Sequence, residues 1–280
     1  MSQITAEVVN NLRQRTGAGI MDCKKALVET SGDVNAAVDL LRKRGVAVAA
    51  KKAGRAATDG VITQYIQPGA KTGLLVEINC ETDFVAKNDI FRQFCDEITK
   101  TLSENPAADL EPLRVAVVAK VGENILISRH ERYQVDGNGA VAAYIHLGNK
   151  IGVLVEVGAG NEATLQRDEF KSAIRDITVQ VAAGSPLVVS REQLDPKIIE
   201  KEREIAAAQM KDKPPQAMAK IIEGKLEKYY QSVCLVDQGF VKRNSEVSLS
   251  AHLAAIGKVL GDTISVRRFT RFQVGETVGE

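Results

Sequence analysis

The sequence repeats itself once, with an offset of 79 residues, and this duplication constrains the fold more than any other feature. Residues 65–77 align with residues 144–156, and eight of the thirteen aligned positions are identical. The agreement continues where Phe91 aligns with Phe170 and Ile98 aligns with Ile177. Because matching apolar patterns bury matching cores, the chain is predicted to contain two structurally related units.

Each copy is predicted to contain an antiparallel hairpin followed by an amphipathic helix. In the first copy, the apolar segments 60–66 and 73–79 flank Pro68-Gly69, a turn signal. Apolar residues then recur at helical spacing over 89–102. The second copy has a hairpin across 147–149 and a helix from about 167 to 183. We therefore expect an α+β fold with a duplicated core of antiparallel sheets, completed by strands over 124–133 and 263–274.

Two segments lie outside this duplicated pattern. The first 45 residues predict three short helices, the last ending near Gly45, and residues 47–55 predict a basic helix or linker. Two further helices, over 196–210 and 215–230, flank a Pro-containing break at 211–215 and predict an antiparallel helical hairpin. The expected domains are a helical domain with its linker at 1–55, a first core subdomain at 56–140, and a second core subdomain at 141–280 that is interrupted by the hairpin at about 190–230.

Composition excludes several classes of protein. The 280 residues carry a net charge of +1, which argues against dedicated nucleic-acid binding. There is no apolar run of about 18 residues that could cross a membrane, and no signal peptide is apparent. The four cysteines are far apart and no two of the three histidines are close in sequence, so we expect reduced thiols, a cytoplasmic location and no metal site.

The sequence also lacks the motifs of common enzymes. Residues 69–72, Gly-Ala-Lys-Thr, resemble the end of a phosphate-binding loop, but Ala70 stands where that motif requires glycine. Residues 17–19, Gly-Ala-Gly, follow a predicted helix rather than a strand, so they predict a turn and not a dinucleotide site. These absences favour a binding protein that has no catalytic residues and no cofactor.

The two copies differ most just after the second strand of the hairpin. There the first copy has Cys-Glu-Thr-Asp-Phe-Val-Ala-Lys at 80–87, and the second has Ala-Gly-Asn-Glu-Ala-Thr-Leu-Gln at 159–166. A simple interpretation is that Thr82 or Asp83 caps a helical turn while Phe84 and Val85 pack beneath it. However, the second copy lacks the phenylalanine, so the shared core does not need it. We therefore predict that residues 82–85, called the corner below, present a rigid aromatic side chain and a carboxylate to a cleft in a partner.

Four segments, taken in order, resemble the elongation factor Ts family of nucleotide-exchange factors for elongation factor Tu. They are the matches within 12–27 (including Arg-Thr-Gly-Ala-Gly-Ile-Met-Asp-Cys-Lys-Lys-Ala-Leu), Asn-Cys-Glu-Thr-Asp-Phe-Val-Ala-Lys at 79–87, Lys-Val-Gly-Glu-Asn at 120–124 and Arg-Phe-Gln-Val-Gly-Glu at 271–276. The resemblance covers essentially the whole chain. It departs from the family pattern at Leu147, beside a position that is often histidine, and at Gly239, where the family usually has proline.

The resemblance implies a specific mode of action. Residues 1–55 would form a ubiquitin-associated-like domain that docks on the GTPase domain of elongation factor Tu through Arg13, Ile20 and Met21. The corner, Thr82, Asp83, Phe84 and Val85, would push between helices of that domain and dislodge the Mg²⁺ that holds GDP, so that GTP can bind. Further contacts would come from Val121, Gly122, His146, Leu147 and Gly148. A one-to-one complex and a two-to-two assembly built on a homodimer both remain open.

Two other functions are compatible with the sequence. The basic residues of segment 42–55 could bind RNA, although a solvated helix face is the favoured interpretation. Alternatively, residues 1–45 and the helical hairpin could act as a scaffold. Steep dependence of RNA binding on salt would indicate the first function, and loss of activity on deleting 195–230 would indicate the second.

Overall fold

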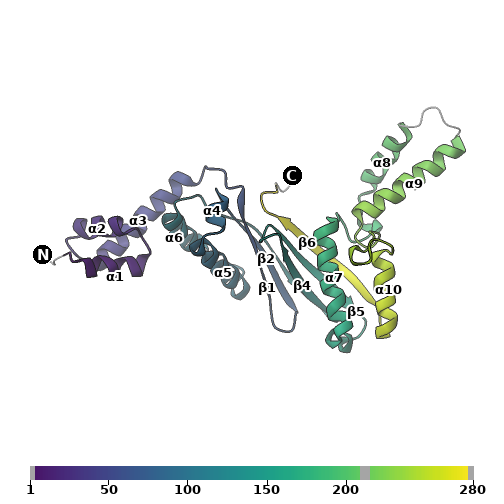
Figure 1. The fold of residues 1–280 in the computed structure, drawn as a ribbon, viewed down its shortest axis with the longest axis horizontal. Coiled ribbons are helices and arrows are strands. Elements are labelled where there is room, and N and C mark those ends of the chain that lie inside the picture. Colours follow the sequence, from purple (N-terminus) through teal and green to yellow (C-terminus); the bar gives the residue numbers. More distant parts are fainter. Residues whose placement is uncertain (1–3, 209–214, 277–280) are drawn as a thin grey trace.

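The structure is a computed structural model that describes residues 4–208 and 215–276, and within them it contains two three-stranded antiparallel sheets (Figure 1). In both sheets the three strands are neighbours in numerical order. The first sheet contains β1 (Asp59–Ile66), β2 (Thr72–Cys80) and β3 (Leu126–Gln134), and the second contains β4 (Gly139–His146), β5 (Ile151–Ala159) and β6 (Ile264–Gln273). The predicted α+β class is confirmed.

The duplication is visible in the helices and in the strand register. The first sheet shares a buried cluster with α5 (Asp89–Glu104) and α6 (Glu111–Val121), and the second shares one with α7 (Asp168–Gly184) and α10 (Leu249–Leu260). The ladder between β2 and β3 shifts register between Glu77 and Ile78, and the ladder between β5 and β6 shifts between Glu156 and Val157. These two irregularities are again 79 residues apart, so the duplication extends to backbone detail.

The two sheets pack face to face, with the helices on their outer faces. One apolar residue from each described strand enters the cluster between them: Ile62, Leu75, Tyr133, Val141, Leu154 and Phe272. Gly152 permits this close approach, since a Cβ atom there would lie 2.4 Å from Cγ2 of Ile62. The core is therefore a four-layer arrangement of helices, sheet, sheet and helices.

Arginine–aromatic contacts between the sheets are reciprocal. The guanidinium of Arg129 in β3 lies 4.2 Å from the ring centre of Phe272 in β6, and that of Arg268 in β6 lies 4.0 Å from the ring centre of Tyr133 in β3. In each pair, the arginine of one sheet contacts the aromatic ring of the other. Such reciprocal contacts are typical of two related units that face each other across an approximate twofold axis. Each arginine is also paired with a buried carboxylate of its own sheet, Arg129 with Glu77 at 2.7 Å and Arg268 with Glu156 at 2.8 Å.

Three N-terminal helices form a separate apolar cluster: α1 (Ala6–Thr16), α2 (Ile20–Glu29) and α3 (Val34–Lys52). The prediction that the third helix ends near Gly45 is wrong, because α3 continues through Gly45 to Lys52. Gly45 is buried against α6, where a Cβ atom would lie 3.5 Å from Cβ of Ala119 and 3.6 Å from Cγ1 of Val115. This glycine therefore lies at a helix–helix contact and does not terminate the helix.

The second repeat is interrupted by α8 (Pro196–Ala208) and α9 (Pro215–Val233), which pack along each other and project from the core (Figure 1). The predicted break at 211–214 lies outside the described residues. Between α9 and β6 the structure has isolated bridges at Cys234 and Gly239, followed by the unpredicted helix α10. No helix in the described parts of the chain is both long and apolar enough to cross a membrane.

Candidate partner-binding surface

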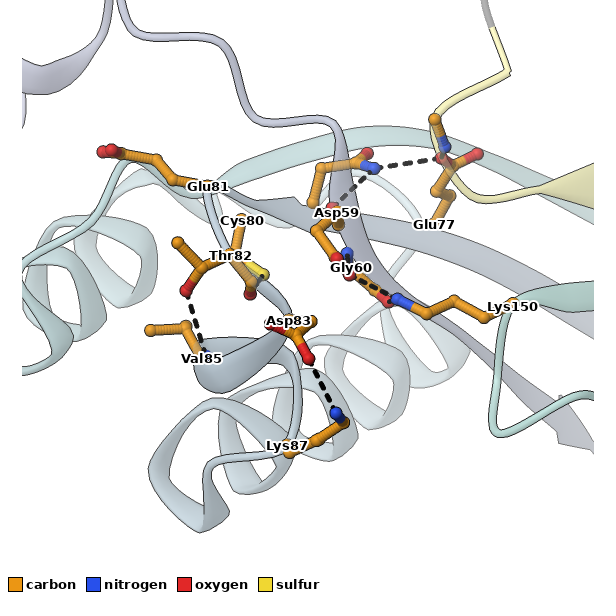
Figure 2. Close-up of polar contacts among 12 residues, drawn as sticks. Asp59, Gly60, Glu77, Cys80, Glu81, Thr82, Asp83, Val85, Lys87 and Lys150 are labelled. Atoms are coloured by element: carbon orange, nitrogen blue, oxygen red, sulfur yellow. Dashed lines mark hydrogen bonds and ion pairs between the residues drawn. The ribbon is translucent and has the colours of Figure 1, made fainter.

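The corner begins directly after β2 and contains the single helical turn α4 (Asp83–Ala86). Thr82 caps this turn, with its Oγ1 accepting a hydrogen bond from the backbone N–H of Val85 at 3.4 Å (Figure 2). Ala86 is buried in the core of the first repeat and Val85 packs against it, whereas Phe84 is 81 % exposed. The simple interpretation that Phe84 packs beneath the turn is therefore wrong.

Glu123, in the loop after α6, fixes the corner from the side. One carboxylate oxygen accepts hydrogen bonds from the backbone N–H groups of Glu81 and Thr82, both at 3.0 Å, and the other accepts from Oγ1 of Thr82 at 2.6 Å. A further hydrogen bond runs in the opposite direction, since the Glu81 carboxylate accepts from the backbone N–H of Asn124 at 2.7 Å. That hydrogen bond is the main reason why the pKa of Glu81 is lowered. The sequence singled out residues 120–124 as a family motif but assigned no function to Glu123.

Beneath the corner, the Cys80 thiol donates to the carbonyl oxygen of Thr82 at 3.1 Å. Burial raises the pKa of Cys80 to about 12, so the thiol stays protonated at neutral pH. On the outer side, the carboxylate of Asp83 pairs with Lys87 at 2.7 Å, one helical turn away (Figure 2). Both side chains are exposed, and such surface pairs add little stability. Asp83 can therefore exchange this partner for another at small cost.

The second copy has a turn of related design, which corrects the expectation that the whole segment is specialised. Here the carboxylate of Asp262 stands in the place of Glu123 and accepts hydrogen bonds from Gly160 N, Asn161 N and Thr164 Oγ1 at 3.0, 2.9 and 2.5 Å. The capped turn thus belongs to both copies. Its outward residue is Ala163 in the second copy and Phe84 in the first, so the exposed phenyl group is the feature that sets the first copy apart.

The tip of the second hairpin presents another exposed apolar residue. Leu147 is 64 % exposed and has a positive φ of 50°, and Gly148 follows with φ 62°. His146 is exposed, and its Nδ1 lies 2.8 Å from the hydroxyl of Tyr144. The tip is anchored to β1 of the first repeat, because the Ile62 N–H donates to the carbonyl oxygen of Asn149 at 2.8 Å and the Asn149 side chain donates back at 3.1 Å.

Asp59, at the start of β1, lies between this hairpin and the corner. Lys150, just after the hairpin tip, donates to the Asp59 carboxylate and, at 2.8 Å, to the carbonyl oxygen of Gly60 (Figure 2). Burial tends to raise the pKa of Asp59, but hydrogen bonds from Lys150 and Gly60 and the positive charges of Lys150 and Lys87 outweigh it, so the pKa is lowered. Because Lys87 pairs with Asp83 of the corner, the corner and the hairpin lie near the same carboxylate.

The predicted N-terminal contact residues are exposed. Ile20 and Met21, the first residues of α2, are 47 % and 59 % exposed, and Arg13 on α1 is also exposed. The turn between α1 and α2 approaches the end of α6: a Cβ atom at Gly17 would lie 2.4 Å from the Lys120 side chain. The N-terminal helices are thus close to the segment that carries the predicted residues Val121 and Gly122.

The end of α3 connects to the same region. Lys52 donates to the carbonyl oxygen of Gly122, and Arg55 pairs with Glu81 at 3.4 Å. Arg44, farther back on α3, pairs with Glu29. Several cations of the basic segment 42–55 therefore have intramolecular partners. A series of direct contacts therefore connects the α1–α2 turn, through Lys120–Glu123, to the corner.

The described part of the chain offers no site for a metal. Within residues 4–208 and 215–276, no three His, Cys, Asp or Glu side chains are grouped so that they could hold an ion. All four cysteines are buried and none forms a disulfide. The predicted contact residues expose aromatic, aliphatic, acidic and basic side chains, including Phe84, Leu147, Asp83 and Arg13.

Comparison with known proteins identifies the family. Residues 81–276 match the family model described as elongation factor TS. The chain is also 42 % identical to elongation factor Ts of Nautilia profundicola, over 99 % of this chain and 94 % of that protein. The chain belongs to the elongation factor Ts family. Elongation factor Ts of Symbiobacterium thermophilum is 41 % identical over 99 % of this chain and 94 % of its own length, and that of Lawsonia intracellularis is 38 % identical over 98 % and 99 %.

Membership of the elongation factor Ts family confirms the resemblance seen in the sequence and makes the chain a translation elongation factor. The departure at Gly239 has a local structural reason, because a Cβ atom there would lie 2.5 Å from Cβ of Ser245. A larger residue at 239 would require the loop around Ser245 to move. Leu147, the other departure, faces solvent and meets no such restriction.

Proposed function

We propose that this chain promotes the release of GDP from elongation factor Tu and thereby allows GTP to bind. The observation that carries the proposal is Phe84, a large apolar side chain that is 81 % exposed on a turn whose backbone is held on both sides. Exposed apolar side chains are common, but one displayed on a fixed turn suits insertion into a partner. The family membership supplies the partner.

The mechanism follows from preorganisation. The corner is already ordered by Glu123 and Thr82, so binding does not require a flexible loop to become ordered. Burying the phenyl group in the partner would contribute about 1.5–3 kcal/mol. Phe84 and Asp83 enter between helices of the GTPase domain, and the resulting displacement dislodges the Mg²⁺ that holds GDP.

Binding and nucleotide release are thermodynamically linked. If the factor lowers the affinity of its partner for GDP, GDP lowers the affinity of the partner for the factor by the same ratio. A typical coupling between distant sites changes affinity only ~5- to 150-fold. Direct displacement of the cation and the diphosphate can exceed this range, which favours a corner that reaches the nucleotide site.

The other predicted residues would hold the complex in place. We propose that residues 1–55 form a docking domain that uses Arg13, Ile20 and Met21. Val121, Gly122 and the hairpin tip His146–Gly148 would add further contacts with the partner. In this arrangement binding affinity comes from several surfaces, whereas acceleration of GDP release comes from the corner.

The test is GDP release from the partner, measured by stopped flow with a labelled nucleotide. Phe84→Ala and Asp83→Ala are each expected to slow release, about 30-fold for Phe84 if it is a binding hot spot worth roughly 2 kcal/mol. Neither change should lower the melting temperature, because both side chains lie outside the core. Val259→Ala, which shortens a 67 % exposed residue of α10, serves as the matched control and should leave release unchanged. Unaltered release in both corner variants would refute the proposal.

A further inference from the structure

Two residues of the loop after α6 form hydrogen bonds with the corner and the preceding Glu81. Asn124 donates one of them, to the Glu81 carboxylate, and the Glu123 carboxylate accepts the others. The Glu123 carboxylate accepts from Glu81 N, Thr82 N and Thr82 Oγ1 at 3.0, 3.0 and 2.6 Å. The two segments are separated by about 40 residues of sequence, so no local backbone rule sets their relation. We propose that Glu123 is a positioning residue for exchange, which acts by holding the backbone of the corner so that Phe84 projects at a fixed angle.

The chemistry of the contact supports this role. An ionised carboxylate that accepts backbone N–H groups forms charge-assisted hydrogen bonds, which are shorter and stronger than neutral ones. Thr82 is also the cap of the turn that carries Phe84, and its Oγ1 donates to Glu123 while accepting from Val85 N. Glu123 therefore holds the turn that carries Phe84 through the Thr82 hydroxyl as well as through two backbone N–H groups.

The second repeat provides an internal control, because a carboxylate there holds a turn that carries no exposed aromatic residue. Asp262 accepts two equivalent backbone hydrogen bonds, from Gly160 N and Asn161 N, and a third from the Thr164 hydroxyl, which aligns with Val85 and not with Thr82; the outward residue of this turn is Ala163. Both carboxylates should therefore contribute in the same way to the stability of their turns. Under the proposed function, only Glu123 supports a residue that enters the partner. Variants at the two sites should therefore distinguish an effect on stability from an effect on nucleotide exchange.

The experiment compares Glu123→Ala with Asp262→Ala in the full chain. Each should lower the melting temperature to a similar degree, because each leaves backbone donors without an acceptor. Only Glu123→Ala should slow GDP release, by about tenfold, the change expected if the loss of its three hydrogen bonds affects release by the equivalent of one charge-assisted hydrogen bond. Glu123→Gln should recover part of the loss, since its amide oxygen can accept from the two N–H groups while its NH₂ donates to Thr82 Oγ1.

A double variant distinguishes positioning from a separate contact with the partner. If Glu123 acts through Phe84, Glu123→Ala should have no further effect on release in a Phe84→Ala background. Equal slowing in both backgrounds would overturn the inference, as would a Glu123→Ala variant that releases GDP at the unmodified rate. Amide hydrogen exchange gives a readout without the partner: the N–H groups of Glu81 and Thr82 should exchange faster in Glu123→Ala, and unchanged protection would also overturn it.

The inference rests on the proposed function, and the two can fail separately. If Phe84→Ala and Asp83→Ala both leave GDP release unchanged, the proposed function fails and the role of Glu123 in exchange fails with it. If Phe84→Ala slows release but Glu123→Ala does not, the function stands and the positioning role of Glu123 is refuted.

Discussion

At the scale of single residues, carboxylates organise the fold. Glu123 and Asp262 hold the two turns, while the buried Glu77 and Glu156 pair with arginines of the neighbouring strands. The pairings differ in exposure: Glu77 and Glu156 are 2 % and 4 % exposed, so removing one partner would leave a charge buried without compensation. The capping carboxylates lie nearer the surface and are the better probes of pH.

The pH dependence of stability should reveal the contribution of Asp262. Its hydrogen bonds, first from the Thr164 hydroxyl and then from backbone N–H groups, lower its pKa below the usual 3.8. The ionised form therefore stabilises the fold above that value, and the stabilisation is lost as the pH falls through the lowered pKa. Asp262→Asn should melt a few degrees lower than the unmodified chain at pH 7, with the gap narrowing below about pH 4.

Thermal melting at several pH values measures this gap. Glu162→Gln, which neutralises an exposed carboxylate of the same turn, is the control and should show little change at any pH. A gap for Asp262→Asn that stays constant down to pH 3 would mean that the charge of Asp262 does not contribute.

At the scale of elements, close approach between segments determines where glycine is required. Gly45 lies inside α3 and faces α6 with enough space for a methyl group. Gly152 lies in β5 between the sheets, where a Cβ atom would lie 2.4 Å from Ile62. The same residue type is thus dispensable in one element and necessary in the other.

Alanine substitution should give opposite results at these two glycines. Gly45→Ala is expected to stabilise the N-terminal helices by about 0.5–1 kcal/mol, because glycine inside a helix costs conformational entropy. Gly152→Ala is expected to destabilise the core by roughly 1–3 kcal/mol through overpacking. Urea denaturation followed by circular dichroism measures both, and a destabilised Gly45→Ala variant would show that α3 and α6 are packed more tightly than the structure indicates.

At the scale of the whole molecule, the two repeats share one interior and the N-terminal helices have their own. The cluster between the sheets draws on all six described strands, so the repeats should unfold together. The cluster of α1–α3 contains no residue of either sheet. We therefore propose that residues 1–55 are a separate domain, whereas 56–140 and 141–280 are subdomains of one folding unit.

Two core substitutions test this division. Leu154→Ala, between the sheets, should cost about 2–5 kcal/mol and reduce amide protection in both sheets together. Leu12→Ala removes a buried side chain of the N-terminal cluster and should reduce protection in α1–α3 while leaving the sheets unchanged. Hydrogen exchange with mass spectrometry gives both measurements, and loss of protection in only one sheet for Leu154→Ala would contradict the shared interior.

The sequence alone determined the features that have local causes. Helical periodicity predicted α5 and α7, and the mismatch between the repeats drew attention to Phe84. The duplication itself predicted two related units and hence the paired sheets. The family followed from four short motifs.

Other features were decided only by tertiary structure. Gly45 resembled a helix end until α6 was seen to pack against it, and α10 was missed although its apolar residues have helical spacing. Glu123 had no assigned function because its partners, Glu81 and Thr82, are distant in sequence. Helix capping and apolar periodicity involve residues only a few positions apart, so they can be recognised in the sequence. Contacts between distant segments depend on how the layers of helices and sheets pack on one another.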